Sequence, residues 1–295
     1  MKDLVFKGAG VALVTPFTDD GINFPELARL IEFNIANGTD AIVITATSGE
    51  AATMSDKEHK DAIKFAVEQV KGRIPVIAGT GSNDTAYAVQ LSQYAEKAGA
   101  DALLMVTPYY NKCTQQGLIK HFTYVADRVN IPIILYNVPS RTGLNIKPAT
   151  YAELAKHPRI VATKEASGDI SAILKVRQLC GDNLTIYSGN DDQIVALMSL
   201  GGKGVISVLS NVVPQYTHDM CQCFFDGKAE EAAKMQVDAL DLIEALFVEV
   251  NPIPVKTALR LMGYQVGPLR LPLCDMEAAN LEQLSIIMRK HGLLK

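Results

Sequence analysis

Short apolar segments recur along the chain about every 30 residues, which is the length of one strand–helix–strand unit. They are continuous rather than alternating, as is typical of strands that are buried on both faces. Eight of them are predicted as strands: Val11–Thr15, Ala41–Ala46, Val76–Gly79, Ala102–Val106, Ile133–Tyr136, Ile160–Thr163, Thr185–Ser188 and Val205–Val208. Such strands, joined by right-handed helical crossovers, predict an α/β protein whose sheet closes into a (β/α)8 TIM barrel.

The segments between the predicted strands carry signals of helix starts. Ser55 and Glu58 have the spacing of a capping box, in which each side chain bonds the backbone N–H of the other residue. Asn190 or Asp191 is expected to cap a later helix. These signals support helices between the strands.

A doubly wound open sheet is the alternative fold. It would normally have fewer strands and a glycine-rich phosphate-binding turn after the first one. This chain has Thr15-Pro16-Phe17 at that point, so the barrel is preferred.

The strand pattern ends before the chain does. We therefore predict a barrel over residues 1–226 and a C-terminal helical extension over residues 227–295, because apolar residues there follow helical spacing. Three helices are predicted in the extension: Lys228–Val248, Val255–Met262 and Glu277–Lys290.

Composition narrows the functional classes. Of the 295 residues, 28 are Lys or Arg and 32 are Asp or Glu, and no basic run indicates a nucleic-acid partner or an anionic membrane surface. No apolar stretch approaches the ~18 residues of a membrane span, and residues 1–10 lack the apolar core of a signal peptide. Five cysteines and five histidines are scattered without metal-ligand spacing. We expect a cytoplasmic protein with no disulfide framework and no metal site.

Polar side chains follow several predicted strands, at the face where barrel enzymes carry their active sites. Lys164 follows one strand directly, and Tyr136 ends the preceding strand. A neutral amine in the barrel mouth can attack a ketone, with the tyrosine as a proton shuttle. The alternative is a lysine that extends to solvent and pairs with Glu165. The neighbouring tyrosine favours the catalytic interpretation.

Other strand ends supply groups that suit a carboxylate. Arg141 lies in a proline-containing turn and has forked donors, although a loop arginine can instead bond backbone carbonyls. Thr47 and Ser48 precede a glycine that lets the backbone approach closely, although they can also simply cap a turn. Tyr109 and Tyr110 are either functional or packing aromatics.

The motifs at these positions are similar to those of one enzyme family. The most specific is Tyr136-Asn137-Val138-Pro139-Ser140-Arg141-Thr142-Gly143, supported by Pro108–Lys112 and Gly204–Val208. With them, the chain closely resembles the dihydrodipicolinate synthase family of class I pyruvate-dependent aldolases. The resemblance implies condensation of pyruvate with L-aspartate-4-semialdehyde to give 4-hydroxy-tetrahydrodipicolinate, the committed step of diaminopimelate and lysine biosynthesis.

The resemblance also implies the catalytic roles. Lys164 forms a covalent Schiff base with pyruvate, so no cofactor and no metal take part. Tyr136 relays protons within a hydroxyl triad that includes Thr47 and Tyr110. Tyr110 reaches in from a neighbouring subunit of a homotetramer that is built as a dimer of dimers.

Substrate-binding roles follow from the same resemblance. Thr47 and Ser48 hold the pyruvate carboxylate, and Ser48 replaces the threonine usual in the family while keeping its hydroxyl. Arg141 receives the carboxylate of the semialdehyde. Gly189 and Ile206 contribute backbone contacts to the pocket.

Some family members bind L-lysine as an inhibitor in a cleft between subunits. The resemblance places the corresponding site, here expected to be degenerate, at Ala51, Asp56, His59, Asn83, Tyr87 and Tyr109. Ala51, Asp56 and Tyr87 replace a serine, a histidine and the glutamate that receives the α-ammonium. We therefore expect weak or absent inhibition by L-lysine.

The same residues leave room for alternative functions of two classes. An N-acetylneuraminate lyase or a 2-keto-3-deoxy sugar acid aldolase would share the chemistry of Lys164 and Tyr136, but Arg141 argues against both. A catalytically silent metabolite-binding barrel belongs to another class, and the intact set of lysine, tyrosines and threonine argues against it.

Overall fold

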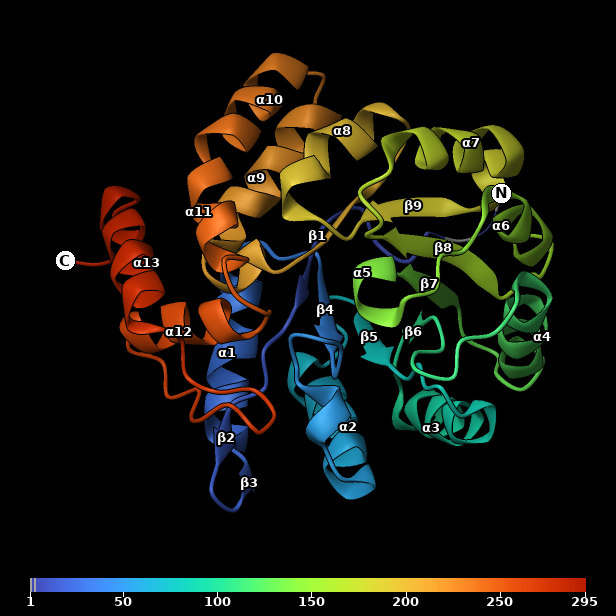
Figure 1. The fold of residues 1–295 in the computed structure, drawn as a ribbon, viewed down its shortest axis with the longest axis horizontal. Helices are drawn as coiled ribbons and strands as arrows, with labels where there is room; N and C mark the ends of the chain where they lie inside the picture. Colours follow the sequence, from blue (N-terminus) through green and yellow to red (C-terminus); the bar gives the residue numbers. More distant parts are fainter. Residues whose placement is uncertain (1, 3) are drawn as a thin grey trace.

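The computed structural model describes residue 2 and residues 4–295, so Met1 and Asp3 of the predicted barrel unit lie outside the described residues. Within the described part, eight parallel strands form one closed barrel in the order β1-β10-β9-β8-β7-β6-β5-β4. The barrel closes because β1 pairs with both β10 and β4. Figure 1 shows the strands at the centre and the helices around them. The predicted TIM barrel is confirmed.

The strands lie close to their predicted positions. Their bounds are β1 Gly8–Ala12, β4 Ala41–Ile44, β5 Val76–Gly79, β6 Ala102–Val106, β7 Ile133–Asn137, β8 Ile160–Glu165, β9 Thr185–Ser188 and β10 Gly204–Ser207. Strand β1 differs most, because it ends at Ala12 although the apolar run continues. Leu13 and Val14 are fully buried, but the Val14 N–H bonds the Asn211 side chain rather than a neighbouring strand. The Leu13 N–H still bonds the Val43 carbonyl of β4, so the strand bonding stops at Val14 while the burial continues, which explains this error.

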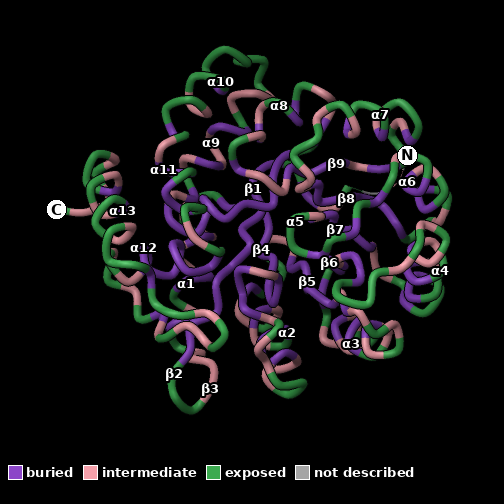
Figure 2. Tube along the Cα trace, viewed as in Figure 1, coloured by how far each residue is buried: buried purple, intermediate pink, exposed green. Residues whose placement is uncertain are grey.

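Both faces of the sheet are buried, which is why the apolar runs are continuous. Side chains such as Val43, Ile134 and Ile206 fill the barrel interior. The alternate side chains pack against the surrounding helices in a second, larger core. In Figure 2 the strands are accordingly almost entirely buried.

Most helices cover the outside of the barrel, whereas the short helix α5 Pro139–Thr142 lies over its mouth (Figure 1). The other helices before the extension are α1 Phe24–Ala36, α2 Asp56–Val70, α3 Thr85–Ala98, α4 Gln115–Ala126, α6 Pro148–Leu154, α7 Ile170–Cys180, α8 Ile194–Ser199 and α9 Pro214–Phe225. The capping box at the start of α2 is confirmed, because Ser55 and Glu58 each bond the backbone N–H of the other. The predicted cap at Asn190 or Asp191 is wrong. Asp191 is buried, and its carboxylate accepts the N–H groups of Val208 and Leu209 at 2.9 Å instead.

The extension begins with α10 Ala229–Asp238, next to the predicted division at residues 226 and 227, which stays a prediction. The single long helix predicted there is wrong, because α10 ends at Asp238 and α11 Leu240–Leu246 follows after Ala239. The buried residues Leu242, Ile243 and Leu246 turn toward the core, and a periodic pattern does not reveal such a bend. Helices α12 Ile253–Leu261 and α13 Ala278–Lys290 complete the extension beside α1 and α11 (Figure 1).

Candidate active site

Tyr136 and Lys164 lie side by side at the ends of adjacent strands. They are register partners on β7 and β8, and 6% and 4% of their surfaces are exposed. The Lys164 Nζ lies 4.4 Å from the centre of the Tyr136 ring. No carboxylate among the described residues lies within ion-pair distance of Lys164, and Glu165 points to the opposite face of the strand. The interpretation of Lys164 as a solvent-facing partner of Glu165 is therefore wrong.

A polar cluster behind the strands fixes their ends. The carboxylate of Glu165 accepts hydrogen bonds from the Tyr151 hydroxyl at 2.8 Å, the Asn137 amide at 2.9 Å and the Ser167 N–H at 2.9 Å. Burial raises the pKa of Glu165, whereas these donors oppose the shift because they stabilise the charged form. Asn137 and Glu165 are also register partners, so their bond ties β7 to β8 one residue beyond Tyr136 and Lys164.

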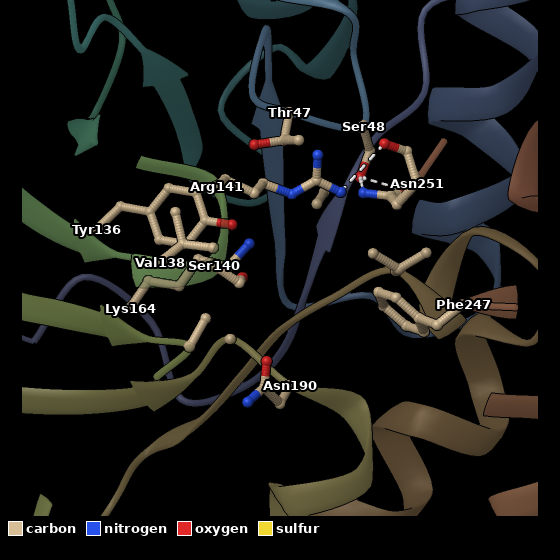
Figure 3. A pocket seen from close by; sticks show the side chains of 14 residues that line it. Thr47, Ser48, Tyr136, Val138, Ser140, Arg141, Lys164, Asn190, Phe247 and Asn251 are labelled. Carbon is tan, nitrogen blue, oxygen red and sulfur yellow. Dashed lines mark hydrogen bonds between the residues drawn. The ribbon is translucent and has the colours of Figure 1, made fainter. Parts of the chain in front are cut away.

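The two residues line a cavity of about 170 Å³ at the mouth of the barrel. This is more than about ten times the space that one water molecule needs. Thr47, Ser48 and Arg141 line the same cavity, as Figure 3 shows. Five of the residues predicted from sequence thus meet around one space.

Arg141 extends across the mouth toward Ser48 and Asn251 (Figure 3). Its Nη2 donates to the Asn251 carbonyl at 3.2 Å, so the expected backbone bond does form. A single such bond leaves most of the five guanidinium donors for a ligand. Arg141 therefore combines both interpretations considered from sequence.

Gly189 lines the cavity next to Lys164. A Cβ atom at this position would lie 2.7 Å from the Ala166 Cβ and 3.1 Å from the Lys164 Cγ. Any other residue would therefore press on the lysine stem, and its side chain would enter the cavity. The sequence prediction of Gly189 as a pocket residue agrees with this geometry.

Two predicted site residues do not line the cavity in this chain. Ile206 lies within the apolar filling of the barrel, and Val208, beyond the end of β10, lines the cavity instead. Tyr110 is 93% exposed, with the left-handed backbone angle φ +66°. The structure of one chain therefore leaves Tyr110 outside the site.

The expected effector positions lie on α2, on α3 and in the loops before them. Asp56 accepts a hydrogen bond from Lys60 at 2.8 Å, and this bond and the Tyr87 hydroxyl lower the pKa of its carboxyl. His59 is buried and faces inward, where its Nε2 lies 2.8 Å from the Gly79 carbonyl. Tyr109 lies near Tyr87. Asp56, Tyr87 and Tyr109 thus lie near one another, whereas the His59 side chain points toward the barrel.

Sequence reasoning missed the contribution of the extension. Phe247 and Asn251 both line the cavity, and Asn190 borders it after β9 (Figure 3). Asn251 is buried, and its side-chain amide donates to the Ser48 hydroxyl at 3.0 Å. The only available signal was the Asn251-Pro252 pair at a helix boundary. Among the described residues, no three His, Cys, Asp or Glu side chains come together as metal ligands.

Comparison with known proteins identifies the family. The profile of the Dihydrodipicolinate synthetase family matches residues 5–291. This chain belongs to that family. The resemblance inferred from sequence is therefore confirmed.

Individual members of the Dihydrodipicolinate synthetase family match nearly the whole chain. The 4-hydroxy-tetrahydrodipicolinate synthase of Thermoanaerobacter sp. (strain X514) is 58% identical over 99% of this chain and 98% of its own. The crystal structure of the enzyme from Cyanidioschyzon merolae with lysine bound superposes with a TM-score of 0.96 at 41% identity, covering 99% and 100% of the chains. The chloride-inhibited enzyme from Acinetobacter baumannii, complexed with pyruvate, gives 0.95 at 40% identity, covering 98% and 99%.

Proposed function

We propose that this chain condenses pyruvate with L-aspartate-4-semialdehyde to give 4-hydroxy-tetrahydrodipicolinate, a step toward diaminopimelate and lysine. The observation that carries this proposal is the buried amine of Lys164 beside Tyr136, facing a cavity that Ser48 and Arg141 border. The shared name of the relatives supports this activity over that of an N-acetylneuraminate lyase or a sugar acid aldolase.

The first half of the proposed reaction activates pyruvate. The Lys164 amine attacks the ketone carbon, water leaves, and an imine forms. Tyr136 moves the protons, with Thr47 as its neighbour in the cavity. Loss of a proton from the methyl carbon then gives an enamine. Ser48 and Thr47 hold the pyruvate carboxylate during these steps.

The second half forms the carbon–carbon bond and releases the lysine. The enamine carbon attacks the aldehyde of the semialdehyde, whose carboxylate is held by Arg141. The amino group of the semialdehyde then attacks the imine carbon, which closes the ring and restores the free Lys164 amine. The protonated imine formed on Lys164 acts as the electron sink, so the proposed scheme uses no metal and no bound cofactor.

Assembly and location complete the proposal. We infer a homotetramer built as a dimer of dimers, in which Tyr110 enters the site of a neighbouring subunit. The exposure of this large aromatic side chain supports a partner surface. A reducing, cytoplasmic location fits the five cysteines, all of which are free thiols. No helix among the described residues is long and apolar enough to cross a membrane.

A turnover assay tests the proposal. The protein is mixed with pyruvate, once with L-aspartate-4-semialdehyde and once without it. In separate reactions it is mixed with N-acetylneuraminate or with a 2-keto-3-deoxy sugar acid. We expect consumption of pyruvate only with the semialdehyde. Faster release of pyruvate from either sugar acid would contradict the proposed substrate.

A further inference from the structure

The extension is joined to the loop that follows β4 by a fully buried ion pair. The Lys256 Nζ on α12 lies 2.7 Å from the Glu50 Oε1, and the two side chains are 0% and 1% exposed. Lys256 also donates to the Pro268 carbonyl at 2.9 Å, and the second Glu50 oxygen accepts the Arg270 N–H at 3.1 Å. Every further side-chain hydrogen bond of the pair thus comes from the extension, and the Lys256 ammonium also lies 4.9 Å from the centre of the Phe17 ring.

Glu50 closes the turn that carries Thr47 and Ser48. Its backbone N–H donates to the Thr47 carbonyl at 3.1 Å. Both flanks of this turn are strained, because Thr45 and Glu50 have φ angles of +54° and +55°, which residues other than glycine rarely adopt. Such a residue keeps its strained backbone only when its surroundings hold it. The Glu50 side chain is held by the extension.

A second link comes from the same part of the extension. Asn251, just before α12, donates to the Ser48 hydroxyl at 3.0 Å. Asn251 and α12 therefore fix the turn at two points, Ser48 and Glu50. One link is made to a cavity-lining hydroxyl itself, and the other lies two residues further along the turn.

A buried ion pair is a poor source of stability, because desolvation of both charges offsets their attraction. Burial lowers the pKa of Lys256, and the Glu50 carboxylate opposes that shift. What such a pair does provide is a specific geometry, since both charges have few acceptable positions. Because the pair lies beside a strained binding turn, its fixed geometry can hold that turn in place.

We propose that Glu50 and Lys256 are positioning residues for pyruvate: their ion pair holds Thr47 and Ser48 where they bind the pyruvate carboxylate. The inference rests on the proposed function, because it assigns support to the carboxylate-binding turn of the same site. It also makes the C-terminal extension a working part of the pocket. Neither residue touches substrate.

The experiment titrates pyruvate against trapping of the Schiff base by borohydride, read by intact mass. In Lys256→Met, which keeps the length of the side chain but removes the charge, we expect the half-saturating pyruvate concentration to rise about 10- to 100-fold. Saturating pyruvate should still label the protein fully, because Lys164 is intact. The KM for the semialdehyde should change less than the KM for pyruvate.

Leu284→Ala serves as the matched control. Leu284 is fully buried in α13, so its truncation leaves a cavity that destabilises the extension without touching the turn. It should lower the melting temperature and leave the pyruvate titration unchanged. If Lys256→Met shifts the titration no more than Leu284→Ala does, the ion pair has only a structural role and the inference is wrong.

Two further arms remove ambiguity. If Lys256→Met does not fold, Glu50→Gln, which keeps the shape of the side chain, should produce a smaller shift in the same direction, and an unshifted titration overturns the inference. A wild-type protein that forms no pyruvate adduct would overturn the proposed function as well. Normal wild-type trapping with unshifted variants overturns the inference alone.

Discussion

Two walls of the pocket reach their geometry by different routes. The reactive wall, Tyr136 and Lys164, stands on two adjacent strands, and Glu165 supports it from the outer face of the sheet. The carboxylate wall, Thr47 and Ser48, is a strained turn that Asn251 and Lys256 hold from the C-terminal extension. One wall is thus supported locally and the other by residues about two hundred positions away.

This difference indicates which elements of a barrel enzyme fix the positions of its site residues. Strand pairing alone places neighbouring side chains on one face, so a strand-end amine needs little further support. A binding turn between a strand and a helix has no such register, and other elements must fix it. We therefore expect substitutions behind the reactive wall to leave pyruvate binding nearly unchanged. Substitutions behind the carboxylate wall should weaken pyruvate binding.

Removal of the reactive amine has the largest expected effect. Lys164→Ala should lower turnover by about 10³-fold or more and abolish trapping of pyruvate, because the nucleophile is missing. Lys164→Arg should fail as well, since guanidinium stays protonated. Steady-state assays and circular dichroism check activity and fold. Lys175→Ala, an exposed lysine on α7, is the control and should behave as wild type.

Arg141 belongs to neither wall, and we predict that it distinguishes the two substrates. Arg141→Ala should reduce kcat/KM for the semialdehyde by roughly 10- to 150-fold, because a charge-assisted carboxylate contact is worth about 1.5–3 kcal/mol. Trapping of pyruvate should remain close to wild type, as it should in the exposed control Arg159→Ala. An equal loss in both measurements would move Arg141 into the pyruvate pocket.

The support behind the reactive wall should tolerate a single loss. Tyr151→Phe removes one donor to Glu165 and should lower the free energy of unfolding by about 1–3 kcal/mol in urea titrations. Asn137 and Ser167 still hold the carboxylate, so pyruvate trapping should keep its wild-type midpoint. A shift as large as that of Lys256→Met would erase the contrast between the two walls.

L-Lysine should have the smallest effect. The turn of the carboxylate wall continues into the expected effector positions, where Asp56 already pairs with Lys60 and Tyr87 replaces a glutamate. Activity at saturating pyruvate should therefore persist in millimolar L-lysine, with D-lysine as the control. Half-inhibition below millimolar concentration would contradict this expectation. Tyr87→Glu should increase sensitivity by restoring a partner for the α-ammonium.

Local patterns in the sequence were sufficient for the barrel and for the reactive wall. Continuous apolar runs mark buried strands, and the residue that ends each run faces the mouth, which is how Lys164 and Tyr136 were found. The ion pair of Glu50 with Lys256 could not be found this way, because tertiary packing alone brings such distant residues together. The backbone contact at Ile206, which the resemblance implies, stays a prediction, although Val208 rather than Ile206 lines the cavity in this chain.

The central claim is that Lys164 forms the Schiff base with pyruvate. The most direct test treats the wild-type protein with pyruvate and borohydride, digests it, and locates the added mass by peptide sequencing. We predict one reduced pyruvyl group per chain, on Lys164. No adduct, or an adduct on another lysine such as the buried Lys256, would contradict the account.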